Sequence, residues 1–168
     1  MAIASATEQA FLRTDTGAIE VKTLPACTVI KTTSDASYFE ENNLFMPLFW
    51  YITTRGIAMT SPVEVEVNPG TMYFYIGGDA KDRALKETDA VEVERIPERL
   101  VASIGYKGAY TEANFQEANN RLKAWLKEQK QYRAIGEAKA IYWDGPSVPK
   151  ARKRAEVHIE LAVESSDA

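Results

Sequence analysis

This sequence is poor in the residues that build covalent or metal-based sites. Among its 168 residues there is one cysteine, Cys27, and one histidine, His158. A single cysteine forms no intrachain disulfide, so we expect a reducing compartment and a cytoplasmic protein. One histidine without a Cys/His cluster excludes a structural zinc site.

Long apolar runs and an excess of positive charge are also missing. Nowhere do about 18 apolar residues follow one another, so we expect no membrane span. Residues 1–10 lack the basic start and apolar run of a secretory signal. The net charge is −4, from 20 basic and 24 acidic residues. This balance argues against a general affinity for nucleic acid.

Motifs of nucleotide and hydrolytic chemistry are absent as well. The glycines at 77, 78, 105 and 108 match neither the dinucleotide-binding spacing nor the phosphate-binding loop. There is no Gly-x-Ser-x-Gly sequence around a nucleophilic serine. The sequence therefore favours a binding protein over an enzyme.

What is present is a loose internal repeat. The segment 21–29, centred on Leu24-Pro25, recurs as 93–101, centred on Ile96-Pro97, so that Val21 and Val93 lie 72 residues apart. Each copy leads into an amphipathic stretch and then into alternating apolar segments. The pattern predicts one structural unit used twice.

The length is that of one domain, so we expect residues 1–168 to form a single domain. Within it we expect repeat one at about 18–78, a linker at about 79–90, and repeat two at about 91–163.

The two repeats are predicted to share a βαββ order. The predicted elements are a strand over 18–33 bent at Pro25, a helix over 38–54 kinked or broken at Pro47, a hairpin of 63–67 and 71–76, a strand over 91–106, a helix with the apolar stripe Phe115, Ala118, Leu122, Trp125 and Leu126, and strands at 138–143 and 155–163. Ser37 with Glu40, and Asn114 with Glu117, have the spacing of helix capping pairs. We therefore expect an α+β fold, in which a mostly antiparallel eight-stranded sheet or distorted barrel carries two long helices.

The first helix is more apolar than a helix that only covers a sheet. A core stripe is predicted at Tyr38, Phe45, Leu48, Phe49 and Ile52, and a second apolar flank at Phe39, Met46 and Trp50. Such a flank packs on the sheet, on another subunit, or on a flat hydrophobic ligand, because tryptophan stacks and methionine adapts its shape.

Charged residues offer two further candidate sites. Alternation in the last strand sets His158 between Glu156 and Glu160 on the polar face, either solvated or as an axial ligand for haem iron. The basic run Lys150, Arg152, Lys153 and Arg154 is either a solvated loop or a clamp for carboxylates or phosphates. Glutamates that gather in a groove would favour a cationic ligand or hold a carboxyl group of raised pKa.

Residues 56–63, Gly-Ile-Ala-Met-Thr-Ser-Pro-Val, resemble the signature segment of the SOUL haem-binding protein family. Residues 19–25 resemble the opening strand of that family, and residues 47–52 resemble the part of its first helix before the signature. The resemblance extends over about 17–163. It implies non-catalytic binding of haem or another tetrapyrrole, a small hydrophobic planar ligand, in an apolar groove beside the first helix. In this reading the platform is Phe39, Met46 and Trp50, with Met59 nearby and Arg152 or Arg154 as partners of the propionates.

The second half also resembles the GyrI-like small-molecule-binding domains, from Gly108-Ala109-Tyr110 to the segment around Tyr142-Trp143. This resemblance implies an alternative, a small-molecule sensor or hydrolase that holds its ligand with an acidic residue and aromatics. The matching positions are Tyr142, Trp143 and Glu156.

Overall fold

The computed structural model describes residues 8–164 in two compact units. Unit 1 comprises residues 8–12 and 26–97, and unit 2 comprises residues 13–25 and 98–164. The chain passes between the units after Leu12, after Pro25 and after Pro97. Residues 1–7 lie outside the described part, and with them most of the segment that is predicted to lack a secretory signal.

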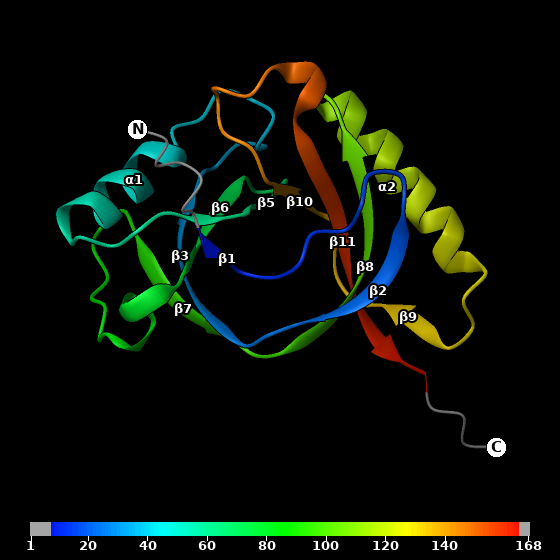
Figure 1. The fold of residues 1–168 in the computed structure, drawn as a ribbon, viewed down its shortest axis with the longest axis horizontal. Helices are drawn as coiled ribbons and strands as arrows, with labels where there is room; N and C mark the ends of the chain where they lie inside the picture. Colours follow the sequence, from blue (N-terminus) through cyan, green and yellow to red (C-terminus); the bar gives the residue numbers. More distant parts are fainter. Residues whose placement is uncertain (1–7, 165–168) are drawn as a thin grey trace. The chain divides into compact units, whose positions relative to one another are not determined.

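Unit 1 is an antiparallel sheet with one helix (Figure 1). The sheet order is β5-β6-β3-β7, and β1 pairs in parallel with β4. The elements are β1 (Glu8–Gln9), β3 (Cys27–Thr33), α1 (Phe45–Thr54), β4 (Thr60–Ser61), β5 (Val63–Glu66), β6 (Thr71–Ile76), the 3₁₀ turn η2 (Gly78–Asp82) and β7 (Glu92–Ile96).

The hairpin of β5 and β6 forms where the sequence predicts it. Val63 pairs with Phe74 and Glu66 with Thr71, which leaves residues 67–70 for the connection. A Cβ atom at Gly70 would lie 2.8 Å from the backbone nitrogen of Tyr38, so only glycine lets that segment approach. The turn therefore also positions the chain that precedes α1.

Unit 2 has a sheet of order β2-β8-β11-β10, with β9 pairing to β11. The helix α2 packs on β8 and β11, as Figure 1 shows. The buried side chains of α2 include Phe115, Ala118 and Leu122, in agreement with the predicted stripe. The elements are β2 (Ile19–Leu24), β8 (Arg99–Lys107), α2 (Glu112–Lys127), β9 (Tyr132–Ala134), β10 (Lys139–Tyr142), the 3₁₀ turn η3 (Lys150–Arg152) and β11 (Arg154–Val163).

The prediction for the start of the first helix is wrong. The helix begins at Phe45, and residues 38–41 form turns and bends instead. The backbone nitrogen of Tyr38 donates to Val67 O at 2.8 Å, so this segment is bound to the hairpin turn. Pro47 then lies in the first helical turn, where its missing N–H costs no helical hydrogen bond. The proline therefore does not kink the helix.

The predicted capping residues differ from the observed ones. The side chain of Ser37 accepts from Phe39 N at 3.3 Å within a local turn and caps no helix. The N-cap of α2 is Thr111, whose hydroxyl accepts from Asn114 N at 3.2 Å. The two helices and the antiparallel strands confirm the predicted α+β class. No helix within residues 8–164 is long and apolar enough to cross a membrane.

Candidate functional site

One face of α1 exposes four large apolar side chains. Phe45, Met46, Phe49 and Trp50 are 41%, 43%, 38% and 62% exposed. The rings of Phe45 and Phe49 stack with their centroids 5.7 Å apart. No residue of α1 is charged. We call these four residues the α1 apolar face. An exposed apolar surface of this kind is a candidate binding site.

The opposite side of α1 packs on unit 1. Leu48, Tyr51 and Ile52 are buried at helical spacing, and α1 contacts β3. Leu48 and Ile52 were predicted for the core, and this is confirmed. The same prediction is wrong for Phe45 and Phe49, because the sheet side of the short helix is filled by Tyr51 and its neighbours. The α1 apolar face is therefore wider than the predicted flank.

None of the other residues predicted for a haem site belongs to this helix. Phe39 is half-buried in the turn before α1, edge-on to Tyr38 with the ring centroids 5.2 Å apart. Met59 is half-buried just before β4. Arg152 and Arg154 belong to unit 2. The guanidinium of Arg154 donates to both carboxylate oxygens of Asp144, at 2.9 and 2.7 Å. Its role as a propionate partner stays a prediction.

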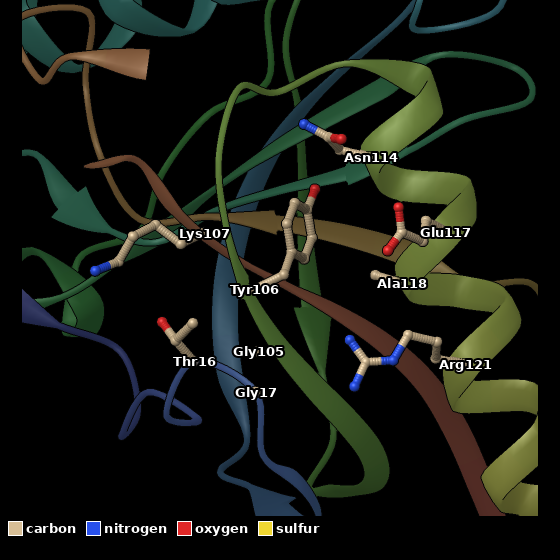
Figure 2. Close-up of a pocket in the computed structure, with 9 residues that line it drawn as sticks. All are labelled: Thr16, Gly17, Gly105, Tyr106, Lys107, Asn114, Glu117, Ala118 and Arg121. Atoms are coloured by element: carbon tan, nitrogen blue, oxygen red, sulfur yellow. The ribbon is translucent and has the colours of Figure 1, made fainter. Parts of the chain in front are cut away.

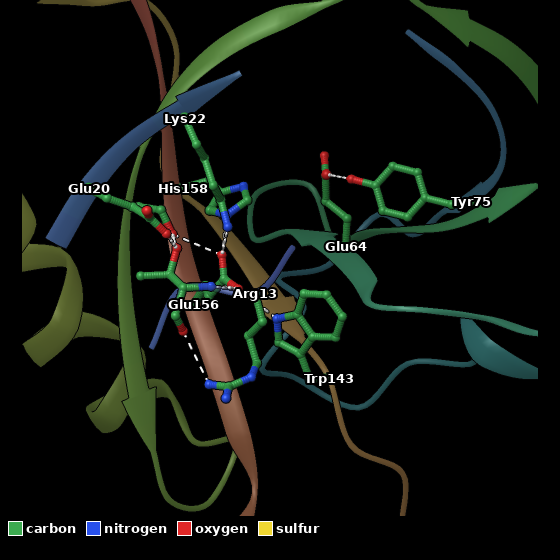
Figure 3. Close-up of polar contacts among 10 residues, drawn as sticks. Arg13, Glu20, Lys22, Glu64, Tyr75, Trp143, Glu156 and His158 are labelled. Atoms are coloured by element: carbon green, nitrogen blue, oxygen red, sulfur yellow. Dashed lines mark hydrogen bonds and ion pairs between the residues drawn. The ribbon is translucent and has the colours of Figure 1, made fainter. Parts of the chain in front are cut away.

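Unit 2 contains a buried carboxylate, Glu156, with five hydrogen-bond donors around it (Figure 3). Oε1 accepts from Lys22 Nζ at 2.8 Å, Ser103 Oγ at 2.8 Å and His158 Nε2 at 2.6 Å. Oε2 accepts from Trp143 Nε1 at 2.7 Å and from the backbone nitrogen of Thr14 at 2.9 Å. The exposed fraction of Glu156 is 0%. We call this set of residues the Glu156 cluster.

The fold of unit 2 brings these partners together from distant parts of the chain. Glu156 of β11 pairs with Gly105 of β8. A Cβ atom at Gly105 would clash with the backbone oxygen of Asp15. Glycine at this position therefore lets the Thr14–Asp15 backbone lie against the sheet. The backbone amide of Thr14 then donates to the Glu156 carboxylate, which is fully buried.

The hydrogen bonds keep Glu156 ionised. Burial alone raises its pKa, but the hydrogen bond and charge of His158, together with Lys22, outweigh burial and lower the pKa to about 2. An ionised carboxylate whose lone pairs are already used is not a proton acceptor at neutral pH and has no free position for a further cation. The expected carboxyl group of raised pKa is therefore not found at Glu156.

Strand alternation predicts the correct face for His158 and the wrong surroundings. The histidine is 3% exposed, and its Nε2 lies against Glu156 rather than in solvent. No three His, Cys, Asp or Glu side chains gather as a metal site in the described part of the chain. A role of His158 as a metal ligand stays a prediction.

The structure brings together two of the three residues of the alternative groove. Trp143 binds Glu156, whereas the ring of Tyr142 stacks on Tyr110 with the centroids 4.0 Å apart. Both aromatic side chains are less than a tenth exposed. Burial raises the pKa of Tyr110 to about 12, and its hydroxyl donates to Arg154 O at 2.6 Å. These aromatic rings act as packing groups within unit 2.

Unit 1 has its own buried acid, Glu64, whose carboxylate accepts a hydrogen bond from Tyr75 (also drawn in Figure 3). On the same sheet face the Tyr73 hydroxyl donates to Glu66 at 2.6 Å. Burial, together with the hydrogen bond to Glu66, raises the pKa of Tyr73. Tyr73 therefore remains a protonated donor to Glu66.

Sequence reasoning missed Lys22, Thr14 and Ser103 as partners of Glu156. Lys22 occupies a polar position of an alternating strand, so the sequence carries no sign that its side chain is only 14% exposed in β2. The hydroxyl groups of Thr14 and Ser103 have no sequence signature of burial.

Comparisons with solved structures show where this fold occurs. The EcmrR C-terminal domain shares 16% sequence identity at a TM-score of 0.70, with 88% of this chain and 98% of that chain covered. EcmrR in a complex with DNA shares 17% sequence identity at a TM-score of 0.69. The match covers 88% of this chain but only 58% of the EcmrR chain. A hydrolase from Listeria innocua shares 9% sequence identity at a TM-score of 0.61, with 89% of this chain and 94% of that chain covered. At these identities the likeness is one of fold alone.

At the level of sequence, no curated protein matches this chain. The sequence profile of one family, described as SOUL heme-binding protein, matches residues 7–160. This match covers nearly the whole chain and includes the Met59-Thr60-Ser61-Pro62-Val63 segment. The chain therefore belongs to the SOUL heme-binding protein family.

Proposed function

We propose that this protein binds haem or another tetrapyrrole on the α1 apolar face, without catalysing a reaction. The observation that carries the proposal is the exposure of Phe45, Met46, Phe49 and Trp50 on one side of a single helix. Membership of a heme-binding family gives this surface an occupant of suitable chemistry. A tetrapyrrole is flat and apolar over most of its area, as this surface requires.

The shape of the surface supports a stacked ligand. The indole of Trp50 and the rings of Phe45 and Phe49 offer flat contact area, and Met46 adapts its thioether to the remaining space. Burial contributes about 25 cal/mol per Å² of apolar area removed from water, less the cost of ordering the ligand. Since α1 carries no charged residue, the helix itself offers no ionic partner to the propionates of a haem.

The proposal is tested by titrating hemin into the protein and following the Soret absorbance. We expect saturation at one hemin per chain, and about a tenfold or greater loss of affinity in Trp50→Ala and Met46→Ala, because each removes a central contact. Iron-free protoporphyrin should bind with similar affinity, since stacking rather than iron ligation is the main contribution.

The control is Val163→Ala in β11, because Val163 is 66% exposed and Trp50 is 62% exposed. This variant should bind hemin as the parent does. Equal losses in Val163→Ala and Trp50→Ala, or absorbance that never saturates, would mean that hemin adheres without a site. Light scattering on the same samples tests whether a second copy of the chain covers the α1 apolar face instead.

The contacts of Glu156 do not favour the alternative, a sensor or hydrolase that uses this residue. Its carboxylate is fully buried and already receives five hydrogen bonds, two of them from Lys22 and His158. A ligand could reach it only by displacing these partners. The proposed function therefore rests on unit 1 alone.

A further inference from the structure

Unit 2 contains a pocket with a volume of about 300 Å³ between α2 and the end of β8 (Figure 2). One wall is a face of α2, formed by Asn114, Glu117, Ala118 and Arg121. The other side is formed by Tyr106 and by the loop at Gly17. The volume is at the lower end of the range for small-molecule sites, so an occupant would have the size of an amino acid.

The helix wall presents one negative and one positive charge to this space. Glu117 and Arg121 are four residues apart and project from the same side of α2, toward Tyr106 in Figure 2. A glutamate four residues before a basic residue has favourable spacing for an ion pair. Within residues 8–164, however, neither side chain takes part in an ion pair. Both charges are therefore available to a ligand.

The side of the pocket opposite α2 is formed by an aromatic ring and a glycine loop. The ring of Tyr106 lies between the helix and the Gly17 loop in Figure 2. Gly17 has a φ of +85°, and the space next to its Cα is open. Its backbone nitrogen donates to Gly105 O at 2.8 Å, which holds the loop against β8. A side chain at this position would be strained and would narrow the pocket.

We propose that this pocket binds a small zwitterion, a free amino acid with an apolar side chain. Its carboxylate would bind the Arg121 guanidinium, its ammonium group would bind Glu117, and its side chain would lie on the Tyr106 ring. Four residues of helix rise by about 6 Å, so a ligand whose opposite charges are one carbon apart contacts both groups at once. Guanidinium is the side-chain group best matched to a carboxylate.

The test uses the ¹⁵N-labelled full chain and three probes: L-phenylalanine, 3-phenylpropionate, which lacks the ammonium group, and phenethylamine, which lacks the carboxylate. L-phenylalanine should shift the amide resonances of Gly17, Gly105 and the Asn114–Arg121 segment in a saturable way. Each analogue should bind about tenfold more weakly, because one charge-assisted hydrogen bond is lost.

Variants make the two charge assignments separable. Arg121→Gln should weaken the binding of L-phenylalanine and 3-phenylpropionate about tenfold and leave the binding of phenethylamine unchanged. Glu117→Gln should weaken the binding of L-phenylalanine and phenethylamine about tenfold and leave the binding of 3-phenylpropionate unchanged. Lys123→Gln is the control, an exposed charge on the same helix that does not line the pocket. All three positions are exposed, so the variants should fold.

Three results would overturn the proposal. One is the absence of saturable shifts with L-phenylalanine. Another is equal binding of all three probes, which would show that neither charge matters. The third is an equal loss in Lys123→Gln and Arg121→Gln, which would show that only the net charge of α2 matters. None of these results bears on hemin binding by α1.

Discussion

At the scale of single residues, the Glu156 cluster explains how a fully buried carboxylate is tolerated. Removing a charge from water costs several kcal/mol unless partners replace the water. Lys22 and His158 balance the charge, while Ser103, Trp143 and the Thr14 amide complete the hydrogen bonding. Breaking one partner of such a set is expected to cost about 3–5 kcal/mol, since the rest remain buried without it.

The lowered pKa of Glu156 predicts a loss of stability in acid. Its pKa is about 2 in the folded state and about 4.5 in the unfolded chain. The unfolded state therefore binds the proton first, and the stabilisation is complete above about pH 5 and is lost as the pH falls toward 2. The loss should reach about 3 kcal/mol. Urea unfolding at a series of pH values measures it.

Two variants assign this acid response to one carboxylate. Glu160→Gln changes an acid on the same strand outside the cluster and should keep the parent's pH dependence. Glu156→Gln should be less stable at neutral pH and should show a shallower loss between pH 5 and 2, because it has no carboxylate to protonate there. An unchanged acid response in Glu156→Gln would contradict the assignment.

Strand alternation gives the face on which His158 and Glu156 lie, but not what covers that face. The covering groups are Thr14, Lys22 and Trp143, which come from other strands and loops of unit 2. Thr14 and Lys22 lie 142 and 134 positions from Glu156 in the sequence, and only the pairing of distant strands brings them to it. Single-sequence periodicity carries no information at that distance.

At the scale of elements, α1 shows why the start of a helix around a proline is hard to predict from sequence. Residues 38–54 have a helical distribution of apolar side chains, and Pro47 within this stretch predicts a kink or a break. The segment before Phe45 instead bonds to the β5–β6 connection through Tyr38 N and Gly70 N. Tertiary hydrogen bonds thus override a local pattern, and Pro47 marks the first turn. The strands were easier to predict, because the hairpin of β5 and β6 has alternation and a turn sequence together.

The position of Pro47 predicts a small effect of its replacement. Pro47→Ala should change the free energy of unfolding by less than about 1 kcal/mol, because no helical hydrogen bond is restored in the first turn. Leu48→Ala, at the next position, should cost about 2–5 kcal/mol, because Leu48 is fully buried. Urea denaturation followed by circular dichroism compares the two. A gain of several kcal/mol in Pro47→Ala would instead indicate a helix strained at its centre.

At the scale of the whole molecule, the chain does not divide into units at the middle of the sequence. Strand β2, from the first half of the chain, pairs with β8 in unit 2. Strand β7 follows the connection after η2 and pairs with β3 in unit 1. Each unit thus takes an edge strand from the other side of the connection. The repeated Leu24-Pro25 and Ile96-Pro97 segments are the places where the chain leaves these edge strands.

This threading predicts that the two halves of the sequence fold only together. If the chain is cut between Ala84 and Leu85, the fragment 85–168 lacks β2 and with it Lys22, and also lacks Thr14. Glu156 would then lose two of its five partners, so this fragment should show no cooperative unfolding. The fragment 1–84 lacks β7. Mixing the two fragments should restore the circular dichroism spectrum and a single unfolding transition.

Lys22→Met in fragment 1–84 should weaken this association at least tenfold, because it leaves the buried Glu156 carboxylate without its ammonium partner. Cooperative unfolding of fragment 85–168 by itself would show that β2 and its lysine are dispensable to unit 2.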